Sequence, residues 1–457
     1  MNITALNRTL RMALALAIVL AGCSSSESSA RKAAPKSSPG STSAKGAVTP
    51  NWTPQTQHAS DGDAPAVPMP EGTPRPYGPS PIATADPAFY DLEGLAPKGP
   101  LGTVLRREVA SPLVGSLAGF EGERVLYSST TGEGTPTIVS GMIIRPNGPT
   151  PPGGWPIAAW AHGTTGIADR CAPSSRGDLF YEIYAAEAKV ALDAGYVVAA
   201  TDYIGLGTQG VHTYLKTDDL GRATIDMVRA AHRENVFAKT RSQWIAFGHS
   251  EGGQAVLAAD AMVPTYAKGL EYLGGISASP SVFLEKVAAA GLSIPDRGYI
   301  GLLLEARAVT DPRVDPGTIL GPKALERRSL LTRGCWEDAV PGFSDMTFSE
   351  FISDPEIGAL LTESAAPWVK VDPTQGTGPL MIVNGTEDES AIFALTEQWV
   401  QEHCDAGFVT TFYPVTGSRH DEVLAKTATE VTQFLKDRRE GVPPPTSCQT
   451  ITIPANG

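Results

Sequence analysis

Short apolar segments alternate with helix-like segments between residues 156 and 277. Four of the apolar runs have the length of buried strands: Pro156 to Trp160, Tyr196 to Thr201, Trp244 to Phe247 and Tyr272 to Ser277. Helix-like segments separate them at Leu179 to Ala194, at Asp218 to Asn235 and after Ser250. Continuous apolar strands that alternate with helices are typical of a parallel sheet covered on both faces. We therefore expect an α/β fold with a mostly parallel, doubly wound sheet.

This alternation stops at about residue 280 and resumes at about residue 379. The intervening stretch contains helix-like pieces, Val282 to Ala290 and Tyr299 to Ala308, and then polar and aromatic residues around Trp336. A structureless loop of this size is uncommon inside a compact domain, so we expect an inserted helical cap at about 280–379. After the insertion, strands are expected at Leu380 to Val383 and Phe408 to Tyr413, and helices at Ala391 to Glu402 and Asp421 to Lys436. Before the alternation begins, a Gly-Glu-Gly turn between Glu123 to Thr130 and Thr137 to Arg145 predicts a β-hairpin.

The N-terminal residues predict export. Arg8 and Arg11 precede the apolar run Met12 to Ala21, which is shorter than the ~20 residues that span a bilayer and fits the core of a signal peptide. The run ends in Leu-Ala-Gly-Cys, which resembles the lipobox of bacterial lipoproteins, so residues 1–22 would be the signal peptide and Cys23 the lipidated residue. A plain secretory signal with an incidental Cys23 is the alternative. The first interpretation gives a protein anchored on the outer side of the cell membrane, and the second a secreted one.

Residues 23–81 differ in composition from the rest of the chain. They are rich in Ser, Ala, Pro, Gly and Thr and contain few large apolar residues, so they cannot bury enough surface to offset the entropy of ordering. We expect a disordered tether, followed by one catalytic α/β domain over residues 82–457 in which order begins near Pro87. The net charge of −13 and the absence of a basic stripe argue against a nucleic acid partner.

Four cysteines remain when Cys23 is set aside: Cys171, Cys335, Cys404 and Cys448. An even number in an exported chain is compatible with two disulfides, for which three pairings are possible. A zinc site is less favoured, because no two of these cysteines form a C-x-x-C pair and none lies near a suitably spaced histidine.

Ser250 lies on a predicted tight turn between a strand and a helix. The sequence Gly-His-Ser-Glu-Gly at 248–252 follows the apolar run that ends at Phe247. Glycines on both sides of the serine permit the close backbone approach of a nucleophile elbow. Such a turn exposes the serine hydroxyl and directs the first helical amides at a developing oxyanion. Because the pentapeptide also occurs in ordinary turns, the interpretation depends on partners elsewhere in the chain.

A nucleophilic serine needs an imidazole base and a carboxylate that orients the imidazole. In α/β-hydrolases the acid and then the histidine follow the serine, each on a loop after a strand. His420 follows the strand that ends at Tyr413 and is the predicted base, whereas His403 lies on a helix and is expected to have a surface or structural role.

The acid comes from the run Glu387-Asp388-Glu389, which follows the strand that ends at Val383. Asp388 is favoured because the shorter side chain suits an acid fixed close to the imidazole. Its two neighbours are expected to lie in a solvated acidic turn. Asp202 also follows a strand, but it precedes the serine, so we expect it to be structural.

An oxyanion hole requires two preorganised amides. The amide of Glu251, directly after the serine, is the first candidate. The second is expected in the loop after Trp160, which reads Ala-His-Gly-Thr-Thr-Gly from residue 161. Gly163 permits close approach of the backbone to a substrate, so the amide of Gly163 or Thr164 would be the second donor, and His162 is expected to brace the loop.

Together with Cys-Ala-Pro-Ser at 171–174 and Asp-Tyr-x-Gly-Leu-Gly at 202–207, these motifs resemble the secretory lipase family over roughly residues 85 to 450. The resemblance implies an α/β-hydrolase core with a helical cap, hydrolysis of acylglycerols and other carboxylic esters, and a triad of Ser250, Asp388 and His420. It also implies disulfides between Cys171 and Cys335 and between Cys404 and Cys448. Fungal members have an acidic residue in the oxyanion loop where this chain has His162-Gly163-Thr164-Thr165.

The expected function is therefore an exported serine carboxylic-ester hydrolase, a lipase or esterase that acts through an acyl-enzyme. Its expected partners are an ester or lipid substrate and, through the N-terminal lipid, a membrane. The chemistry requires neither a metal nor an organic cofactor. A peptidase or an acyltransferase with the same triad is an alternative, and so is a non-catalytic lipoprotein that binds lipid. The natural ester is left open, because the cap decides what enters the site.

Overall fold

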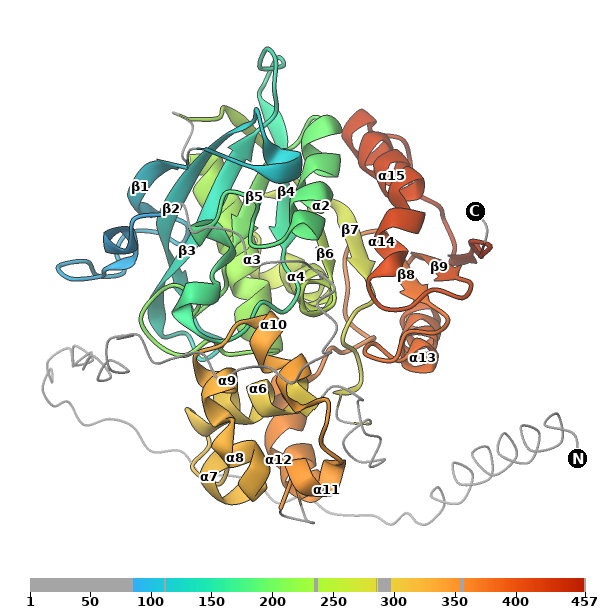
Figure 1. The fold of residues 1–457 in the computed structure, drawn as a ribbon. Coiled ribbons are helices and arrows are strands. Elements are labelled where there is room, and N and C mark those ends of the chain that lie inside the picture. Colours follow the sequence, from blue (N-terminus) through green and yellow to red (C-terminus); the bar gives the residue numbers. More distant parts are fainter. Residues whose placement is uncertain are drawn as a thin grey trace, which may run out of the picture. The chain divides into compact units, whose positions relative to one another are not determined.

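The structure is a computed structural model that describes residues 85–455, except residues 111, 234–236, 285, 287–296 and 354–356. The predicted signal peptide, Cys23, the whole of the expected tether and its boundary with the domain lie outside the described residues. Within the described part, helices cover a ten-stranded sheet, and a further group of helices is inserted between two of its strands (Figure 1).

The sheet has the strand order β1-β2-β3-β5-β4-β6-β7-β8-β9-β10. The first three strands are β1 (Val104–Ala110), β2 (Glu121–Thr130) and β3 (Pro136–Arg145). They pair antiparallel in this order, and β3 also pairs antiparallel with β5. The remaining strands pair parallel: β4 (Trp155–Ala161), β5 (Val197–Thr201), β6 (Thr240–His249), β7 (Glu271–Ala278), β8 (Leu380–Gly385), β9 (Thr410–Val415) and β10 (Gln449–Thr450). Strands β4, β5 and β8 are buried along their whole length, as their continuous apolar sequences require. The predicted α/β fold is confirmed.

The predicted hairpin is also confirmed, because β2 and β3 pair in register from Glu121 with Arg145 to Thr130 with Pro136. The two edge strands were not predicted. In β1 the sequence Arg-Arg-Glu at 106–108 interrupts the apolar pattern and Val109 is 70% exposed, while β10 has only two residues and both are exposed. Charged and very short strands are typical of sheet edges, where an apolar pattern would promote aggregation.

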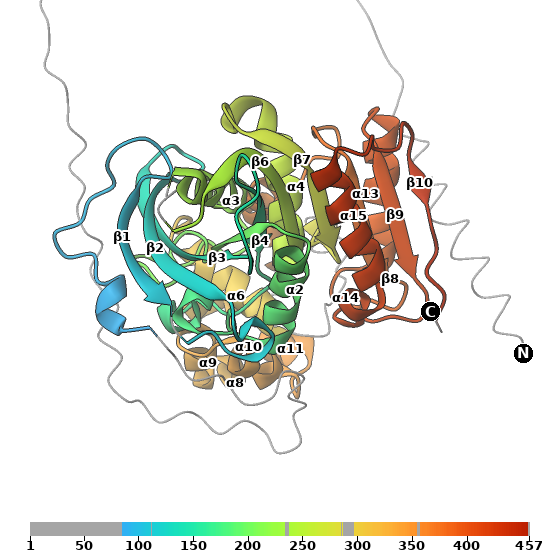
Figure 2. The same cartoon turned by 90° about the horizontal axis from the view of Figure 1, so that it is seen from above.

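Helices lie on both faces of the sheet (Figure 2). One face packs against α2 (Glu182–Asp193), α14 (Glu422–Lys426) and α15 (Ala428–Glu440), and the other against α3 (Thr217–Arg233), α4 (Glu251–Tyr266) and α13 (Phe393–Asp405). Alternate residues of β4 separate accordingly: Ala158 and Trp160 belong to the first core, and Ile157 and Ala159 to the second. This two-sided burial holds the strand ends, and the loops that follow them, in fixed positions.

The prediction of a single helix over residues 421–436 is wrong in one respect, because the segment forms two helices, α14 and α15. Thr427 separates them with φ −114° and ψ 13°, outside the α-helical region, and its hydroxyl donates to the Val423 carbonyl at 2.7 Å. Such a bond from a threonine side chain to the backbone competes with helix continuation.

The insertion between β7 and β8 is helical, as expected. Its described helices are α6 (Arg297–Ala308), α7 (Pro316–Ile319), α8 (Pro322–Glu326), α9 (Arg328–Thr332), α10 (Trp336–Ala339), α11 (Phe348–Phe351) and α12 (Ile357–Val369). They share a core of their own around Leu302, Leu331 and Phe351. Most of the helix expected at Val282 to Ala290 lies outside the described residues.

Short 3-10 helices complete the described secondary structure: η2 (Pro87–Tyr90), η3 (Gly115–Leu117), η4 (Asp169–Cys171), η5 (Pro173–Ser175) and η6 (Pro341–Phe343). Across the described ranges, no helix has both the length and the apolar character that crossing a bilayer demands.

Candidate active site

Ser250 occupies the sharp turn between β6 and α4. Its backbone has φ 60° and ψ −119°, which is unusual for a residue with a side chain and costs about 1–3 kcal/mol. Hydrogen bonds hold it there: the Ser250 amide donates to the Ala278 carbonyl at 2.9 Å, and the Ser250 carbonyl accepts from the Gln254 amide at 3.1 Å. The predicted nucleophile elbow thus has the strained geometry that projects a serine from the end of a strand.

The two glycines of the elbow are required by close backbone packing. A Cβ atom added to Gly252 would overlap the Ala161 carbonyl oxygen at the end of β4, and one added to Gly248 would overlap the same oxygen. Because β4 and β6 are parallel neighbours, the loop after β4 passes directly beside the elbow. The two glycines that flank Ser250 at a distance of two residues are therefore required by steric contact with β4.

Ser250, His420 and Asp388 form a chain of hydrogen bonds. The distance from Ser250 Oγ to His420 Nε2 is 2.9 Å, and His420 Nδ1 lies 2.9 Å and 3.0 Å from the two carboxylate oxygens of Asp388. The His420 side chain is 12% exposed and that of Asp388 is fully buried. His420 is on the loop after β9 and Asp388 on the loop after β8, so two parallel strands bring the imidazole and the acid to the same sheet edge.

The carboxylate of Asp388 is fixed by its own loop. One oxygen accepts from the amides of Ser390 at 3.0 Å and Ala391 at 2.8 Å, and the other accepts from the side-chain amide of Asn384 at 2.9 Å. The neighbours differ, as expected: Glu387 is exposed, and Glu389 pairs with Arg419 at 2.7 Å. Asn384 was not predicted as a site residue, although a polar residue directly after the apolar run Leu380 to Val383, within β8, was a usable signal.

The charges around His420 raise its proton affinity. Burial opposes protonation, but the negative charge of Asp388 and the hydrogen bond to it outweigh burial and raise the pKa of His420 to about 9. The charges of Asp421 and Glu389 act in the same direction. Burial of Asp388 opposes its ionisation, yet the charge and hydrogen bond of His420 keep the pKa of Asp388 below its ordinary value. The acid is therefore ionised and the imidazole strongly basic.

The predicted oxyanion loop lies against the serine. A Cβ atom added to Gly163 would be 3.5 Å from Ser250 Cβ and 2.6 Å from Tyr184 Oη, so a side chain at this position would force the loop or the tyrosine to move. Glu251 is the first residue of α4, where backbone amides are free of helical partners. The Thr164 side chain is engaged elsewhere, because its Oγ1 lies 2.9 Å from Tyr214 Oη, which leaves its backbone as the group that can face a substrate.

His162, Asp202 and His403 have structural positions. His162 is buried within the loop it was expected to brace, with Nδ1 2.6 Å from the Gly163 carbonyl, and burial lowers its pKa to about 4. Asp202 is buried and accepts from Ser140 Oγ at 2.6 Å and the Ser174 amide at 2.8 Å. His403 stacks between two aromatic rings, with Nδ1 2.7 Å from the Pro373 carbonyl.

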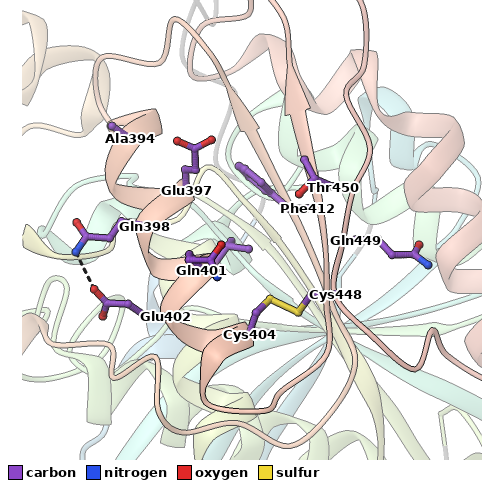
Figure 3. A pocket seen from close by; sticks show the side chains of 11 residues that line it. Ala394, Glu397, Gln398, Gln401, Glu402, Cys404, Phe412, Cys448, Gln449 and Thr450 are labelled. Atoms are coloured by element: carbon purple, nitrogen blue, oxygen red, sulfur yellow. Dashed lines mark hydrogen bonds between the residues drawn. A yellow bond between two sulfur atoms is a disulfide. The ribbon is translucent and has the colours of Figure 1, made fainter. Parts of the chain in front are cut away.

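Both expected disulfides are present. Cys171 is bonded to Cys335 and joins the segment after the oxyanion loop to the cap, and Cys404 is bonded to Cys448 and joins α13 to the segment of β10. The second disulfide lies at a groove of about 610 Å³ that is lined by Glu397, Gln401, Phe412 and Thr450 among others (Figure 3). None of Ser250, His420 and Asp388 lines this groove.

One group of side chains has the composition of a metal site. Ligand atoms of His249, His420 and Asp421 lie within 4.8 Å of one another. However, His249 Nε2 is 3.1 Å from the His420 carbonyl oxygen, and the two ring nitrogens of His420 face Ser250 and Asp388. These ring nitrogens are thus engaged in the hydrogen bonds of the serine site.

Comparisons with known proteins find a matching family model and several similar proteins. A family model described as secretory lipase matches residues 182–446, which is more than half of the chain. Lipase A of Arthroderma benhamiae is 25% identical over 426 residues, with 85% of each chain covered. Among solved structures, lipase A of Candida antarctica matches 81% of this chain and 90% of its own with a TM-score of 0.66 and 18% identity. The rice cell wall degrading esterase LipA of Xanthomonas oryzae matches 74% of this chain and 98% of its own, with a TM-score of 0.58 and 17% identity.

Proposed function

Because the chain belongs to the secretory lipase family, we propose that it is an exported carboxylic-ester hydrolase that works through an acyl-enzyme on Ser250. The observation that carries this proposal is the continuous hydrogen-bond chain from Ser250 through His420 to Asp388. A strained serine, a basic imidazole and a buried ionised acid in this order are the components of acyl transfer by a serine nucleophile.

Acylation begins when Ser250 Oγ attacks the ester carbonyl carbon while His420 Nε2 accepts the hydroxyl proton. The carbonyl π electrons move to the oxygen, which becomes the oxyanion of a tetrahedral intermediate. The intermediate collapses, the bond to the alcohol oxygen breaks, and His420 returns the proton to the departing alcohol. Asp388 stabilises the imidazolium that exists between these two proton transfers.

Deacylation repeats the sequence with water. His420 accepts a proton from water as the water oxygen attacks the acyl carbon, and a second oxyanion forms. Collapse breaks the bond to Ser250 Oγ, which regains its proton from His420, and the carboxylic acid leaves. In both steps the amide of Glu251 and the amide of Gly163 or Thr164 would donate to the oxyanion. The position of Gly163, where an added Cβ would be 3.5 Å from Ser250 Cβ, supports that role.

The proposed substrates are carboxylic esters, including acylglycerols. The relatives are named lipases and a cell wall degrading esterase, so the range of esters within this fold is wide. Rates on p-nitrophenyl esters of increasing acyl length, measured with and without a lipid interface, distinguish a lipase from a short-chain esterase. If none of these esters is hydrolysed, the alternative of a non-catalytic lipid-binding lipoprotein is favoured.

A fluorophosphonate probe tests the nucleophile directly. The wild-type protein should be labelled and Ser250→Ala should not. The matched control is Ser349→Ala, because Ser349 is an exposed serine of the cap with no contact to the site, and this variant should be labelled like the wild type. Labelling of Ser250→Ala at the wild-type level would reject Ser250 as the nucleophile.

The location is part of the proposal. Lipidation of Cys23 would anchor the protein to the outer side of the cell membrane, with residues 23–81 as the tether. Cys23→Ala should then move the protein from the membrane fraction to the medium. Unchanged membrane association of this variant would contradict a lipid anchor at Cys23.

A further inference from the structure

Glu251 has two roles that conflict electrostatically. Its backbone amide is the first proposed oxyanion donor, while its side chain carries a carboxyl group that is 1% exposed. A buried negative charge on the residue that must stabilise a second negative charge would oppose the reaction. The site therefore requires a side chain that neutralises Glu251, either by a positive charge or by sharing a proton with it.

His212 lies at the required position. Its Nε2 is 3.0 Å from Glu251 Oε1, and its Nδ1 is 3.2 Å from the Ile204 carbonyl oxygen. An imidazolium donates through both nitrogens and satisfies an ionised Glu251 and the Ile204 carbonyl together, whereas a neutral imidazole satisfies both only when Glu251 carries the proton. In either arrangement the pair of side chains has no net charge. The His212 side chain is also 1% exposed, and it stacks on the Tyr203 ring at a centroid distance of 5.8 Å, a contact that favours a cation.

The other group near Glu251 that could carry a positive charge does not. Burial lowers the pKa of His162 to about 4, so His162 is neutral at physiological pH. The Leu215 amide adds a second hydrogen bond to Glu251 Oε1 at 3.4 Å, but it adds no net charge. Among the described contacts of Glu251, His212 is therefore the one that can neutralise the carboxylate.

The loop that carries His212 also holds the second half of the proposed oxyanion hole. Tyr203 Oη donates to the His162 carbonyl at 2.9 Å, and Tyr214 Oη lies 2.9 Å from Thr164 Oγ1. Loop residues 203–215 thus contact Glu251 at the elbow and the oxyanion loop at His162 and Thr164. Their side chains hold the residues that carry both proposed donors before a substrate arrives.

We propose that His212 is a positioning residue that neutralises Glu251 and fixes the elbow, so that the Glu251 amide can stabilise the oxyanion. The inference rests on the proposed function, since it assigns a role within the same reaction. It predicts that the two side chains act as a pair, so the effect of removing His212 depends on whether Glu251 is still charged.

A double-mutant cycle tests the pairing. The variants are His212→Gln, Glu251→Gln and the double variant, with kcat and KM measured on p-nitrophenyl butyrate. His212→Gln should lower kcat by about 100-fold, as expected for an impaired oxyanion donor, with little change in KM. The double variant should recover most of that loss. Equal loss in the double variant and in His212→Gln would overturn the proposal.

A second readout separates this role from a purely structural one. Butaneboronic acid forms a tetrahedral adduct on a serine nucleophile, so its inhibition constant should rise in His212→Gln in proportion to the loss of kcat. The matched control is His403→Gln, which removes another buried histidine and should lower the melting temperature with kcat unchanged. A boronate constant in His212→Gln that equals the wild-type value would contradict the proposal.

If His212→Gln does not fold, the double variant must fold and hydrolyse the ester, because the uncompensated charge is then absent; failure of both would overturn the pairing. Wild-type protein that neither reacts with fluorophosphonate nor hydrolyses esters would reject the proposed function itself. Wild-type activity with strictly additive effects in the cycle would reject only the role of His212.

Discussion

The imidazole of His420 and the carboxylate of Asp388 lie on the loops that follow two adjacent parallel strands, with Nδ1 2.9 Å from Oδ2. Strand pairing alone brings these loops together, because β8 and β9 are in register from Leu380 with Thr410 to Gly385 with Val415. The acid and the base are thus positioned by the sheet, and Ser250 reaches the same edge from β6. This arrangement permits specific predictions about each member.

Asp388→Asn should lower kcat by about 10³–10⁴-fold with little change in the fold. The amide side chain keeps the shape but cannot stabilise the imidazolium, and it favours the wrong tautomer of His420. Ester hydrolysis with a folding check by circular dichroism measures this effect. Glu387→Gln is the matched control, because Glu387 is the exposed neighbour of Asp388, and this variant should keep the wild-type kcat. A larger loss in Glu387→Gln than in Asp388→Asn would reassign the acid.

The triad residues could be predicted because each follows a strand that has a distinct apolar sequence. Ser250 also has the glycine pattern of the elbow, and the position of His420 after a predicted strand separated it from His403, which lies on a predicted helix. The relative positions of the loops depend on a parallel sheet, which strand and helix alternation indicates well.

Other parts of the site could not be read from the sequence. His212 and Tyr214 lie outside the motifs read from the sequence, and their roles arise from contacts with Glu251 and Thr164, which are distant in the chain. The edge strand β1 was missed because its charged residues hide the strand pattern. Tertiary contacts of this kind carry no local signal.

Activity should depend on pH through His420. The base must be neutral to accept the serine proton, so kcat/KM should be low when His420 is protonated and should rise as pH increases through its pKa. Because Asp388, Asp421 and Glu389 raise that pKa to about 9, the midpoint should lie above the ordinary histidine value of 6.5. A midpoint at or below that value would contradict the assigned electrostatics.

Glu389→Gln tests the contribution of one of these charges. Removing a negative charge near His420 weakens its hold on the proton, so the midpoint of the kcat/KM profile should move to lower pH. Glu93→Gln removes an exposed charge that is not among those acting on His420 and should leave the midpoint in place. A shift of the midpoint to higher pH in Glu389→Gln would contradict the assigned effect of the Glu389 charge on His420.

Gly163→Ala should impair catalysis through a steric effect. The new methyl group would lie 2.6 Å from Tyr184 Oη, so the oxyanion loop or the tyrosine must move, and displacement of a donor by about 1 Å costs about 100-fold in kcat. Adding Tyr184→Phe removes the clashing oxygen and should restore part of the rate. Gly122→Ala, where the nearest contact would be 3.4 Å, is the control and should keep wild-type kcat.

The two disulfides should differ in their contribution to stability. Cys171 and Cys335 are separated by 164 residues and Cys404 and Cys448 by 44, so the first cross-link restricts the unfolded chain more strongly. In the chain-entropy description, Cys171→Ala with Cys335→Ala should lower the free energy of unfolding by about 1 kcal/mol more than Cys404→Ala with Cys448→Ala. Urea denaturation of the two double variants and the wild type measures the difference.

The first disulfide should also affect the site, because it joins the segment after the oxyanion loop to the cap. The Thr165 carbonyl accepts from the Trp336 amide at 2.7 Å beside this disulfide, so loss of the cross-link loosens a direct contact between the two parts. We expect the Cys171 and Cys335 double variant to lose kcat as well as stability, and the Cys404 and Cys448 variant to lose stability alone. Equal kcat in both variants, measured well below their unfolding midpoints, would show that the cross-link does not support the oxyanion loop.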